Sequence, residues 1–463
     1  MKKEISTMKL YKIILYIATP TFVFASNTPL LDILEQINLE LKKSVTQQDL
    51  NATNSLDKEA VAKREEIKLS KENIQSFKHK FIENRDAEDY YNLGVEALDE
   101  ANYNEAILYF QKAVEINPKD DSSYYNMGIA YNHKKEYDKA IEAYQKAVEI
   151  NPKKDGAYYN MGNAYSDKKE YDKAIEAYEK AVEINPKKDK AYYNMGIAYY
   201  DKKEYDKAIE AYEKAVKFNP KDDEAYCNMG NAYYDKKEYN KAIKAYEKAV
   251  EINPKKDGAY NNIGIAYDEK QEYDKAIEAY EKAVEINPKN DEAYNNMGIA
   301  YANKKEYDKA IEAYEKAVEI NPKIDEAYYN MGNAYTHKKE YDKAIKACQK
   351  AVEINPKIDE AYTGLFELQL IQNQAFDQAL EAKYIELFQN QKESFIHYEM
   401  LKIFQAISRG ETVGIEAWKQ KYDGVGLDWG FDELREWIEG LDEGELKARL
   451  FETLAFFEGR EGV

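Results

Sequence analysis

The chain has 463 residues, of which 44% are hydrophobic, and its formal net charge is −20 at pH 7. Proteins that bind nucleic acids need clustered Lys and Arg for phosphate contacts, so this charge argues against that class. The only two cysteines, Cys227 and Cys348, are too few for a small disulfide-stapled secreted domain.

Residues 1–25 have the pattern of a secretory signal peptide. Four lysines in the first twelve residues precede the apolar run Ile13–Ala25, which ends in small residues before Ser26. The run is too short to cross a bilayer comfortably, and an N-terminal core helix or an uncleaved anchor is the alternative. If cleavage follows Ala25 we expect an exported protein, periplasmic or secreted, with no other membrane association; otherwise it is cytoplasmic.

Residues 26–86 predict a helical and polar N-terminal segment. Leu30, Leu34, Ile37 and Leu41 follow a heptad-like spacing, but two heptads are too few for a coiled coil. One amphipathic helix is the simpler interpretation, and a dimerisation helix is the alternative. A charged helix is then expected to lead into residue 87.

From residue 87 the chain repeats itself every 34 residues. The period is marked by eight prolines: Pro118, Pro152, Pro186, Pro220, Pro254, Pro288, Pro322 and Pro356. When this proline is numbered position 32, eight repeats span 87–358. A fixed period of this length indicates a solenoid whose units bury their apolar faces only against their neighbours.

Each repeat predicts two helices. At about 100° per residue, positions 4, 7, 8 and 11 share one face and are expected to be the buried stripe of the first helix. Gly at position 8 and Ala at position 20 favour close approach of the two helices. Asn185-Pro186 is expected to end a second helix, and pairs such as Glu176–Lys180 are expected on its exposed side.

The stripe residues of the third repeat are Tyr158, Met161, Gly162 and Tyr165, followed by the alanines at positions 20 and 27. In length, residue types and spacing these copies resemble the tetratricopeptide repeat family. The resemblance implies an all-α fold, an α-solenoid in which helix pairs form a right-handed superhelix. It also implies that first helices line a concave surface that binds protein or peptide partners.

Positions 2, 6, 9 and 13 lie about 180° from the stripe by the same periodicity. Position 6 is asparagine in every repeat: Asn92, Asn126, Asn160, Asn194, Asn228, Asn262, Asn296 and Asn330. A primary amide can pair with both the N–H and the C=O of a backbone, so the eight side chains predict a ladder that binds an extended peptide. In some long arrays of the family, asparagines here are understood to hold peptides. The alternative is a polar surface multiplied by duplication, and position 6 has no packing role that the sequence assigns.

The last part of the chain differs in composition. From residue 359 onward it has 22 acidic against 10 basic residues, whereas the repeat 155–188 has seven against six. Residues 359–392 predict a degenerate ninth repeat that caps the solenoid, with Phe366 in place of the position-8 glycine. Residues 393–463 predict an acidic C-terminal helical bundle. Its expected helices are 394–408, 413–422, 431–441 and 443–457. All three tryptophans, Trp418, Trp429 and Trp437, fall there and are expected to anchor a small core.

No motif for phosphate, zinc or redox chemistry is present in the sequence. His133 and His337 share repeat position 13 but lie six repeats apart, and Cys227 and Cys348 lie too far apart for a disulfide. We therefore expect no enzyme, no catalytic or metal-binding residue and no cofactor.

Three functions remain open. The first is a non-enzymatic scaffold that binds an extended peptide or protein in the concave groove. The second is an assembly or co-chaperone-like factor that acts through the convex face or the C-terminal helices. The third is an enzyme with its site in 394–463, which predicts a polar pocket there.

Overall fold

The structure is a computed structural model that describes residues 86–411, 413 and 432–458. The chain divides into Met1–Asp86 and Ala87–Val463, and the second unit contains almost everything described. The predicted signal peptide, the segment 26–85, Trp418, Trp429 and the body of the predicted helix 413–422 lie outside the described residues. None of the described helices combines the length and the apolar character that a membrane span needs.

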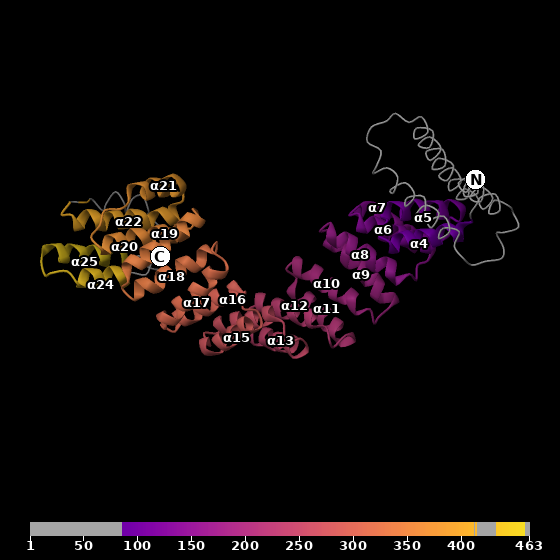
Figure 1. The fold of residues 1–463 in the computed structure, drawn as a ribbon, viewed down its shortest axis with the longest axis horizontal. Coiled ribbons are helices and arrows are strands. Elements are labelled where there is room, and N and C mark those ends of the chain that lie inside the picture. The colour runs from indigo at the N-terminus through magenta and orange to yellow at the C-terminus, as the bar shows by residue number, and fades with distance from the viewer. Residues whose placement is uncertain (1–85, 412, 414–431, 459–463) are drawn as a thin grey trace, which may run out of the picture. The chain divides into compact units, whose positions relative to one another are not determined.

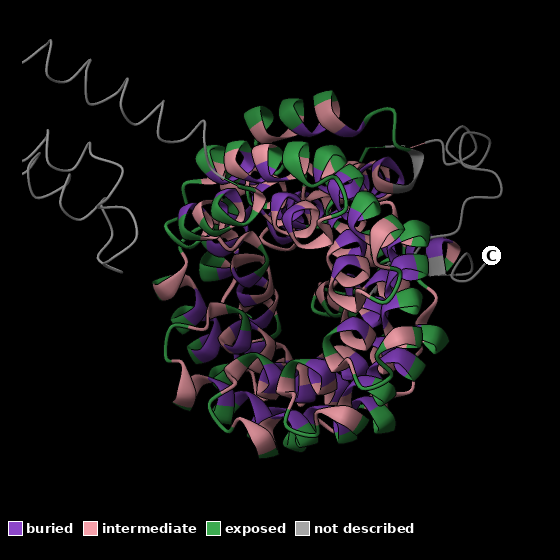
Figure 2. Cartoon of the chain, turned by 90° about the vertical axis from the view of Figure 1, so that its right-hand side faces the viewer, coloured by how far each residue is buried: buried purple, intermediate pink, exposed green. Residues whose placement is uncertain are grey.

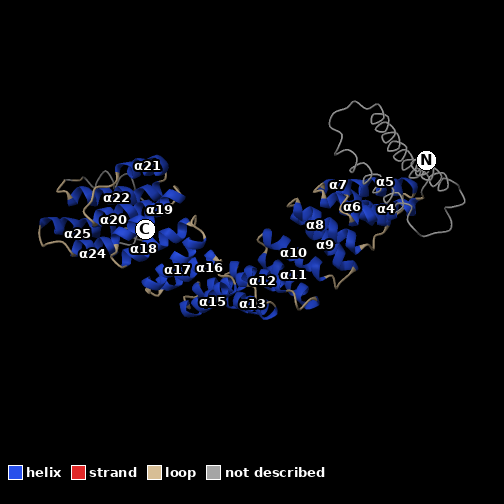
Figure 3. Ribbon diagram, viewed as in Figure 1, coloured by secondary structure: helices blue, strands red, loops and turns tan. Residues whose placement is uncertain are grey.

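All secondary structure of the described residues is helical, and the elements follow one another as alternating first and second helices (Figures 1 and 3). The first helices are α4 (Ala87–Asp99), α6 (Asp121–His133), α8 (Asp155–Asp167), α10 (Asp189–Asp201), α12 (Asp223–Asp235), α14 (Asp257–Asp268), α16 (Asp291–Asn303) and α18 (Asp325–His337). The second helices are α5 (Tyr103–Ile116), α7 (Tyr137–Ile150), α9 (Tyr171–Ile184), α11 (Tyr205–Phe218), α13 (Tyr239–Ile252), α15 (Tyr273–Ile286), α17 (Tyr307–Ile320) and α19 (Tyr341–Ile354). Each second helix packs on the first helix of its own repeat and on that of the next. The predicted all-α solenoid is confirmed.

Backbone geometry sets the length of both helices. After each first helix one residue adopts a left-handed conformation, such as Lys169 with φ 61°, and the N–H of Glu170 then donates to the Tyr165 carbonyl over 2.9 Å. This arrangement satisfies carbonyls that the helix end would otherwise leave unpaired. Each second helix ends at the Asn-Pro pair as predicted, because Asn185 before Pro186 leaves the α conformation with φ −124° and ψ 86°.

The buried face of the first helix differs from the one that the sequence pattern indicated. Met161 is buried as expected, but Tyr158 and Tyr165 at positions 4 and 11 are only half-buried. The fully buried residues beside Met161 are Ala157 and Ala164, at positions 3 and 10. The first helix touches two second helices, so small residues occupy the closest approaches and the large tyrosines extend toward the surface. Buried residues accordingly gather on the helix sides that meet other helices (Figure 2).

The position-8 glycine makes room for an aromatic ring. A methyl group added to Gly162 would lie 2.5 Å from Cε1 of Tyr178, a position-24 side chain that is only 1% exposed. The glycine was predicted to let the two helices of a repeat approach closely. The group that approaches it is the aromatic ring of the second helix, which packs against the backbone of the first helix. Cys348 occupies position 24 in the eighth repeat and is 2% exposed, so it packs there as a small apolar residue.

Ion pairs on the second helices follow a different spacing from the one expected. Within the described chain, Glu176 and Lys180 form no ion pair with each other. Instead Lys173 pairs with Glu170 at 2.7 Å, three residues away, and the same pairing recurs in other repeats. Glu170 precedes the first turn of α9, where the positive end of the helix favours a carboxylate.

Residues after the eighth repeat continue the stack and close it. They form α20 (Asp359–Ile371), α21 (Gln378–Phe388), α22 (Lys392–Ser408), α24 (Asp432–Glu439) and α25 (Glu445–Glu458). The predicted helices 394–408, 431–441 and 443–457 are thus present with small shifts of their ends. One hydrophobic cluster joins them to the eighth repeat. Its largest buried members are Tyr362, Phe366, Tyr384, Phe404 and Phe457. Phe and Tyr therefore anchor the described core, and Trp437 packs only at its edge.

Candidate functional site

The surface of interest is made of positions 2, 5, 6, 9, 12 and 13 of every repeat, which we call the first-helix face. First helices of successive repeats contact each other directly, as α6 and α8 do. Hydrogen bonds connect position 5 to position 6 of the next repeat, and position 12 to position 13 of the next repeat. The face is therefore continuous from one repeat to the next.

The position-6 asparagines bridge neighbouring repeats. Most of them donate from Nδ2 to the position-5 residue of the preceding repeat, and Asn228 donates to the Tyr193 hydroxyl over 3.0 Å. The same bond joins Asn126 to Tyr91, Asn160 to Tyr125, Asn194 to Tyr159, and Asn296 to Oδ1 of Asn261, at 3.2–3.3 Å. Asn92 is exposed, and Asn330 is half-buried. Position 6 thus has a structural role that the sequence did not assign.

Asparagines at position 9 extend this network. Oδ1 of Asn231 accepts from the Tyr246 hydroxyl at 2.8 Å and from Nδ2 of Asn262 at 3.2 Å. Asn163 accepts in the same way from Tyr178 and Asn194, both at 2.8 Å. These oxygens already accept hydrogen bonds from within the chain. The position-9 asparagines therefore stabilise the first-helix face in addition to forming part of its surface. The 35-residue offset between positions 5 and 6 of adjacent repeats is the signal that sequence reasoning missed.

The network leaves hydrogen-bonding capacity unused. The side chain of Asn228 is half-buried, and its Oδ1 accepts no hydrogen bond from the described part of the chain. The second Nδ2 hydrogen is also uncommitted, since an amide carries two donors. One oxygen and one N–H therefore remain for a partner at this side chain.

Asp268, at position 12 of the sixth repeat, is an unusual member of the face. Its Oδ2 accepts from the Tyr280 hydroxyl at 2.7 Å, but its buried Oδ1 meets no donor among the described residues. Burial raises the pKa of this carboxyl to about 6, the neighbouring Glu269 adds to the rise, and the Tyr280 hydroxyl opposes it. Burial in an apolar setting disfavours the charged form of a carboxyl group.

We expect Asp268→Asn to stabilise the protein at neutral pH. The folded-state pKa is raised, so protonated Asp268 stabilises the fold fully below pH 3.8, and this contribution is lost as pH rises through about 6. The gain in free energy of unfolding should be about 1–2 kcal/mol at neutral pH, since solvent around the half-buried side chain weakens the effect. Urea denaturation at neutral pH and at pH near 4 tests this. The gain should vanish at the lower pH, and the exposed control Glu278→Gln should change little. Equal stability of Asp268→Asn and the natural protein at neutral pH would contradict it.

The two position-13 histidines pack on aromatic rings. His133 stacks on Tyr103 with ring centroids 4.9 Å apart, and His337 stacks on Tyr307 at 4.8 Å. Each tyrosine belongs to the preceding repeat, so the histidines pack between repeats. Among the described residues, no three His, Cys, Asp or Glu side chains form a group suited to hold a metal ion.

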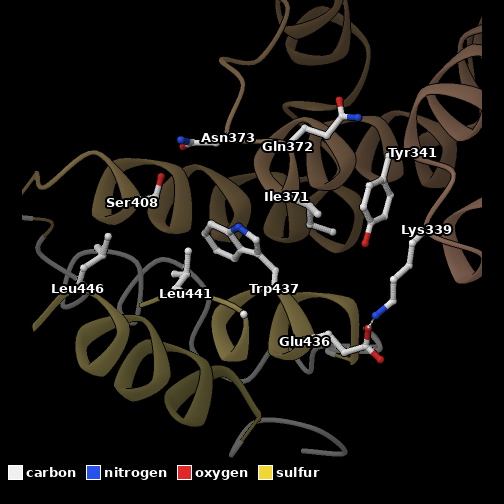
Figure 4. A pocket seen from close by; sticks show the side chains of 11 residues that line it. Lys339, Tyr341, Ile371, Gln372, Asn373, Ser408, Glu436, Trp437, Leu441 and Leu446 are labelled. Atoms are coloured by element: carbon white, nitrogen blue, oxygen red, sulfur yellow. Dashed lines mark ion pairs between the residues drawn. The ribbon is translucent and has the colours of Figure 1, made fainter. Parts of the chain in front are cut away.

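A cavity of about 470 Å³ lies where the C-terminal helices meet the eighth repeat (Figure 4). Its lining includes Trp437, Tyr341 and Ser408, together with the exposed ion pair between Lys339 and Glu436 at 2.7 Å. The hydrogen bond to Glu436 raises the pKa of Lys339. A lysine held protonated in this way is a poor general base at neutral pH. Polar side chains line part of the cavity, as the hypothesis of an enzyme site in 394–463 predicts. The two charged residues of the lining, Lys339 and Glu436, are paired with each other.

Comparisons with known proteins agree with this geometry. A family model described as "Tetratricopeptide repeat" matches residues 87–120, 122–154, 156–188, 223–256, 258–290, 291–324 and 325–358. A second model with that description matches 177–210, and one described as "TPR repeat" matches 196–237. Together they take in more than half of the chain and all eight predicted repeats. No curated protein sequence matches the chain.

Similar solved structures include MamA, with 36% identity, a TM-score of 0.34, and coverage of 35% of this chain and 95% of MamA. Another is YrrB, titled a TPR protein with an unusual peptide-binding site, with 28% identity, a TM-score of 0.36, and coverage of 40% of this chain and 96% of YrrB.

The repeat period, the helix-pair packing and the matches over all eight repeats lead to one conclusion. The chain belongs to the tetratricopeptide repeat family, whose members are generally non-enzymatic scaffolds that bind proteins or peptides.

Proposed function

We propose that this protein is an interaction scaffold that binds an extended peptide segment of a partner along the first-helix face. The observation that carries the proposal is the row of position-6 amides, one per repeat, with hydrogen-bonding groups left over at side chains such as Asn228. Half-buried amides of this kind are held in a fixed orientation, so little side-chain entropy is lost when a partner binds.

An extended backbone suits such a row. It presents N–H and C=O groups at regular intervals, and an amide side chain can accept from the first and donate to the second. Half-buried tyrosines at position 5, such as Tyr159 and Tyr193, lie beside the amides and add contact area. Tyrosine is enriched at protein interfaces because it combines an apolar ring with a polar end. Binding of this type depends little on the side chains of the peptide.

The proposal is tested with three consecutive amides. We expect the triple variant Asn160→Ala, Asn194→Ala and Asn228→Ala to weaken binding of a fluorescein-labelled alternating Gln–Ser peptide by about 10- to 100-fold. This estimate takes each of the three lost hydrogen bonds as about 0.5–1 kcal/mol, with about 1.4 kcal/mol for each tenfold change in affinity. Fluorescence anisotropy measures the affinity, and circular dichroism checks that the variant remains helical.

The chain offers a matched control. Tyr125→Phe, Tyr159→Phe and Tyr193→Phe remove the hydroxyls that accept from the same three amides, but leave the amides in place. This control should keep most of the affinity. If it loses as much affinity as the alanine variant, repeat packing rather than the amide row is responsible. Unchanged binding by the alanine variant would favour an inherited polar surface and an assembly role for the convex face or the C-terminal helices.

A further inference from the structure

Helix α24 lies against the C-terminal end of the first-helix face. When the 34-residue period is counted onward from residue 358, α20 is the first helix of a ninth unit, with Glu367 at position 9 and Ile371 at position 13. Nδ1 of His337, at position 13 of the eighth repeat, is 3.5 Å from Oε1 of Glu433 on α24. Ile371 lines the same cavity as Trp437 of α24 (Figure 4). Position 13 is exposed in all eight repeats, but Ile371 is half-buried, so a helix of the chain itself covers the end of the face.

The contact that holds α24 in place is small. The helix has eight residues, and its buried residues are Leu434 and Ile438. Its ion pair between Glu436 and Lys339 of the eighth repeat is exposed, and exposed pairs contribute little to stability. Helix α25 packs on α22 as well as on α24, and it buries a row of apolar side chains that includes Leu454. Release of α24 therefore requires much less apolar surface to be exposed than release of α25.

A carboxyl group of the first-helix face lies at this contact. Burial raises the pKa of the Glu367 carboxyl well above its usual range, and the charge of Glu433 on α24 adds to the rise. Other titratable groups at this end of the face are Glu360 on α20 and Tyr329 and His337 on α18. A raised pKa means that the surroundings disfavour the ionised form, so ionisation of Glu367 opposes the docking of α24.

Helix α24 also leaves a hydrogen-bonding group of the face unpaired. The position-9 oxygens of Asn163 and Asn231 each accept two hydrogen bonds, whereas Oε1 of Glu367 is buried and meets no donor among the residues that the structure describes. An unpaired buried acceptor costs free energy. Release of α24 removes this cost, because water or the N–H groups of a peptide can then donate to Glu367.

We propose that α24 is an internal competitor, which occupies the C-terminal end of the first-helix face and is displaced when a partner peptide extends across the eighth repeat into the ninth unit. The inference rests on the proposed function and adds its regulation. Docked α24 shortens the face that is open to a partner, and the energy needed to release the helix lowers the affinity for long segments.

Hydrogen exchange with mass spectrometry tests the displacement on the full chain. The probe is an alternating Gln–Ser peptide of about 30 residues, which in extended form spans roughly 100 Å and can follow eight first helices spaced about 10 Å apart. We expect saturating peptide to speed exchange of residues 432–439 at least about tenfold, while residues 445–458 of α25 keep their protection.

Three variants test the competition. Leu434→Ala weakens the docking of α24 and should raise the affinity for this peptide about three- to tenfold, because the apparent affinity follows the fraction of molecules whose site is free. Leu454→Ala is the matched control, since it truncates an equally buried leucine of α25, and it should change the affinity less than about twofold. Glu367→Gln removes the charge beneath α24. It should lower the affinity about threefold and slow exchange of residues 432–439 in the free protein.

Two results would overturn the inference alone. One is unchanged or slower exchange of residues 432–439 in the presence of saturating peptide, which would make α24 a fixed cap or a part of the binding site. The other is equal affinity of the Leu434→Ala and Leu454→Ala variants for the peptide. In either case the proposed function stands if the alanine variant of the amide row loses affinity. If the peptide binds neither the natural protein nor the Leu434→Ala variant, the proposed function and the inference both fail.

Discussion

Gly230→Ala is expected to lower the free energy of unfolding by about 2 kcal/mol. The added methyl group would lie 2.5 Å from Cε1 and 2.6 Å from Cδ1 of Tyr246, and this ring is enclosed between helices. Atoms cannot stay at that distance, so the ring or one of the two helices must shift. The higher helix propensity of alanine offsets at most about 1 kcal/mol of the cost.

Gly364→Ala is the matched control. Gly364 lies in the middle of α20, and a methyl group added there meets nothing within 4 Å. Only the higher helix propensity of alanine then acts, and we expect the free energy of unfolding to rise by up to about 1 kcal/mol. Urea denaturation followed by circular dichroism measures both variants. If Gly230→Ala is as stable as Gly364→Ala, the ring does not occupy the space assigned to it.

Tyr246→Ala is expected to have the largest effect of any single substitution considered, about 3–5 kcal/mol. The side chain is 2% exposed, and its hydroxyl donates to Oδ1 of Asn231 at 2.8 Å. Alanine removes the ring and leaves a cavity between helices α12 and α13. Tyr246→Phe removes only the hydroxyl, and Asn231 still accepts from Asn262, so we expect a loss of about 1 kcal/mol.

The double variant Gly230→Ala with Tyr246→Ala separates a clash from a general loss of packing. Once the ring is gone, the new methyl group has space and fills part of the cavity. The two losses should therefore not add. When Tyr246 is already alanine, Gly230→Ala should lower the free energy of unfolding by at most about 0.5 kcal/mol. Additive losses would show that Gly230 matters for a reason other than the ring.

The period and the turn residues were sufficient to predict the fold. Pro186 ends α9 where expected, and Met161 is buried where expected. The spacing of apolar residues along one helix was insufficient to predict all of its buried positions, because a first helix packs on the second helices of two repeats. Ala157 and Ala164 are buried by that double contact, which a single-helix projection omits.

The same limit applies to the candidate site. The sequence placed the asparagines on one face, but it left position 6 without a packing role. Asn228 bonds to Tyr193 of the previous repeat, and only the stacking of repeats brings those side chains together. In the C-terminal region, the tryptophans were expected to anchor a small core because all three of them fall there. The described core is built from Phe366, Tyr384 and their aromatic neighbours instead.

The central claim is that a partner binds along the first-helix face. Photo-crosslinking tests it most directly, with a benzophenone in the middle of the alternating Gln–Ser peptide and mass spectrometry of the crosslinked fragments. The account predicts attachment to the first helices, among them α8, α10 and α12, with loss of crosslinks in the triple variant Asn160→Ala, Asn194→Ala and Asn228→Ala. Attachment concentrated on the second helices, or on α22, α24 and α25, would contradict it.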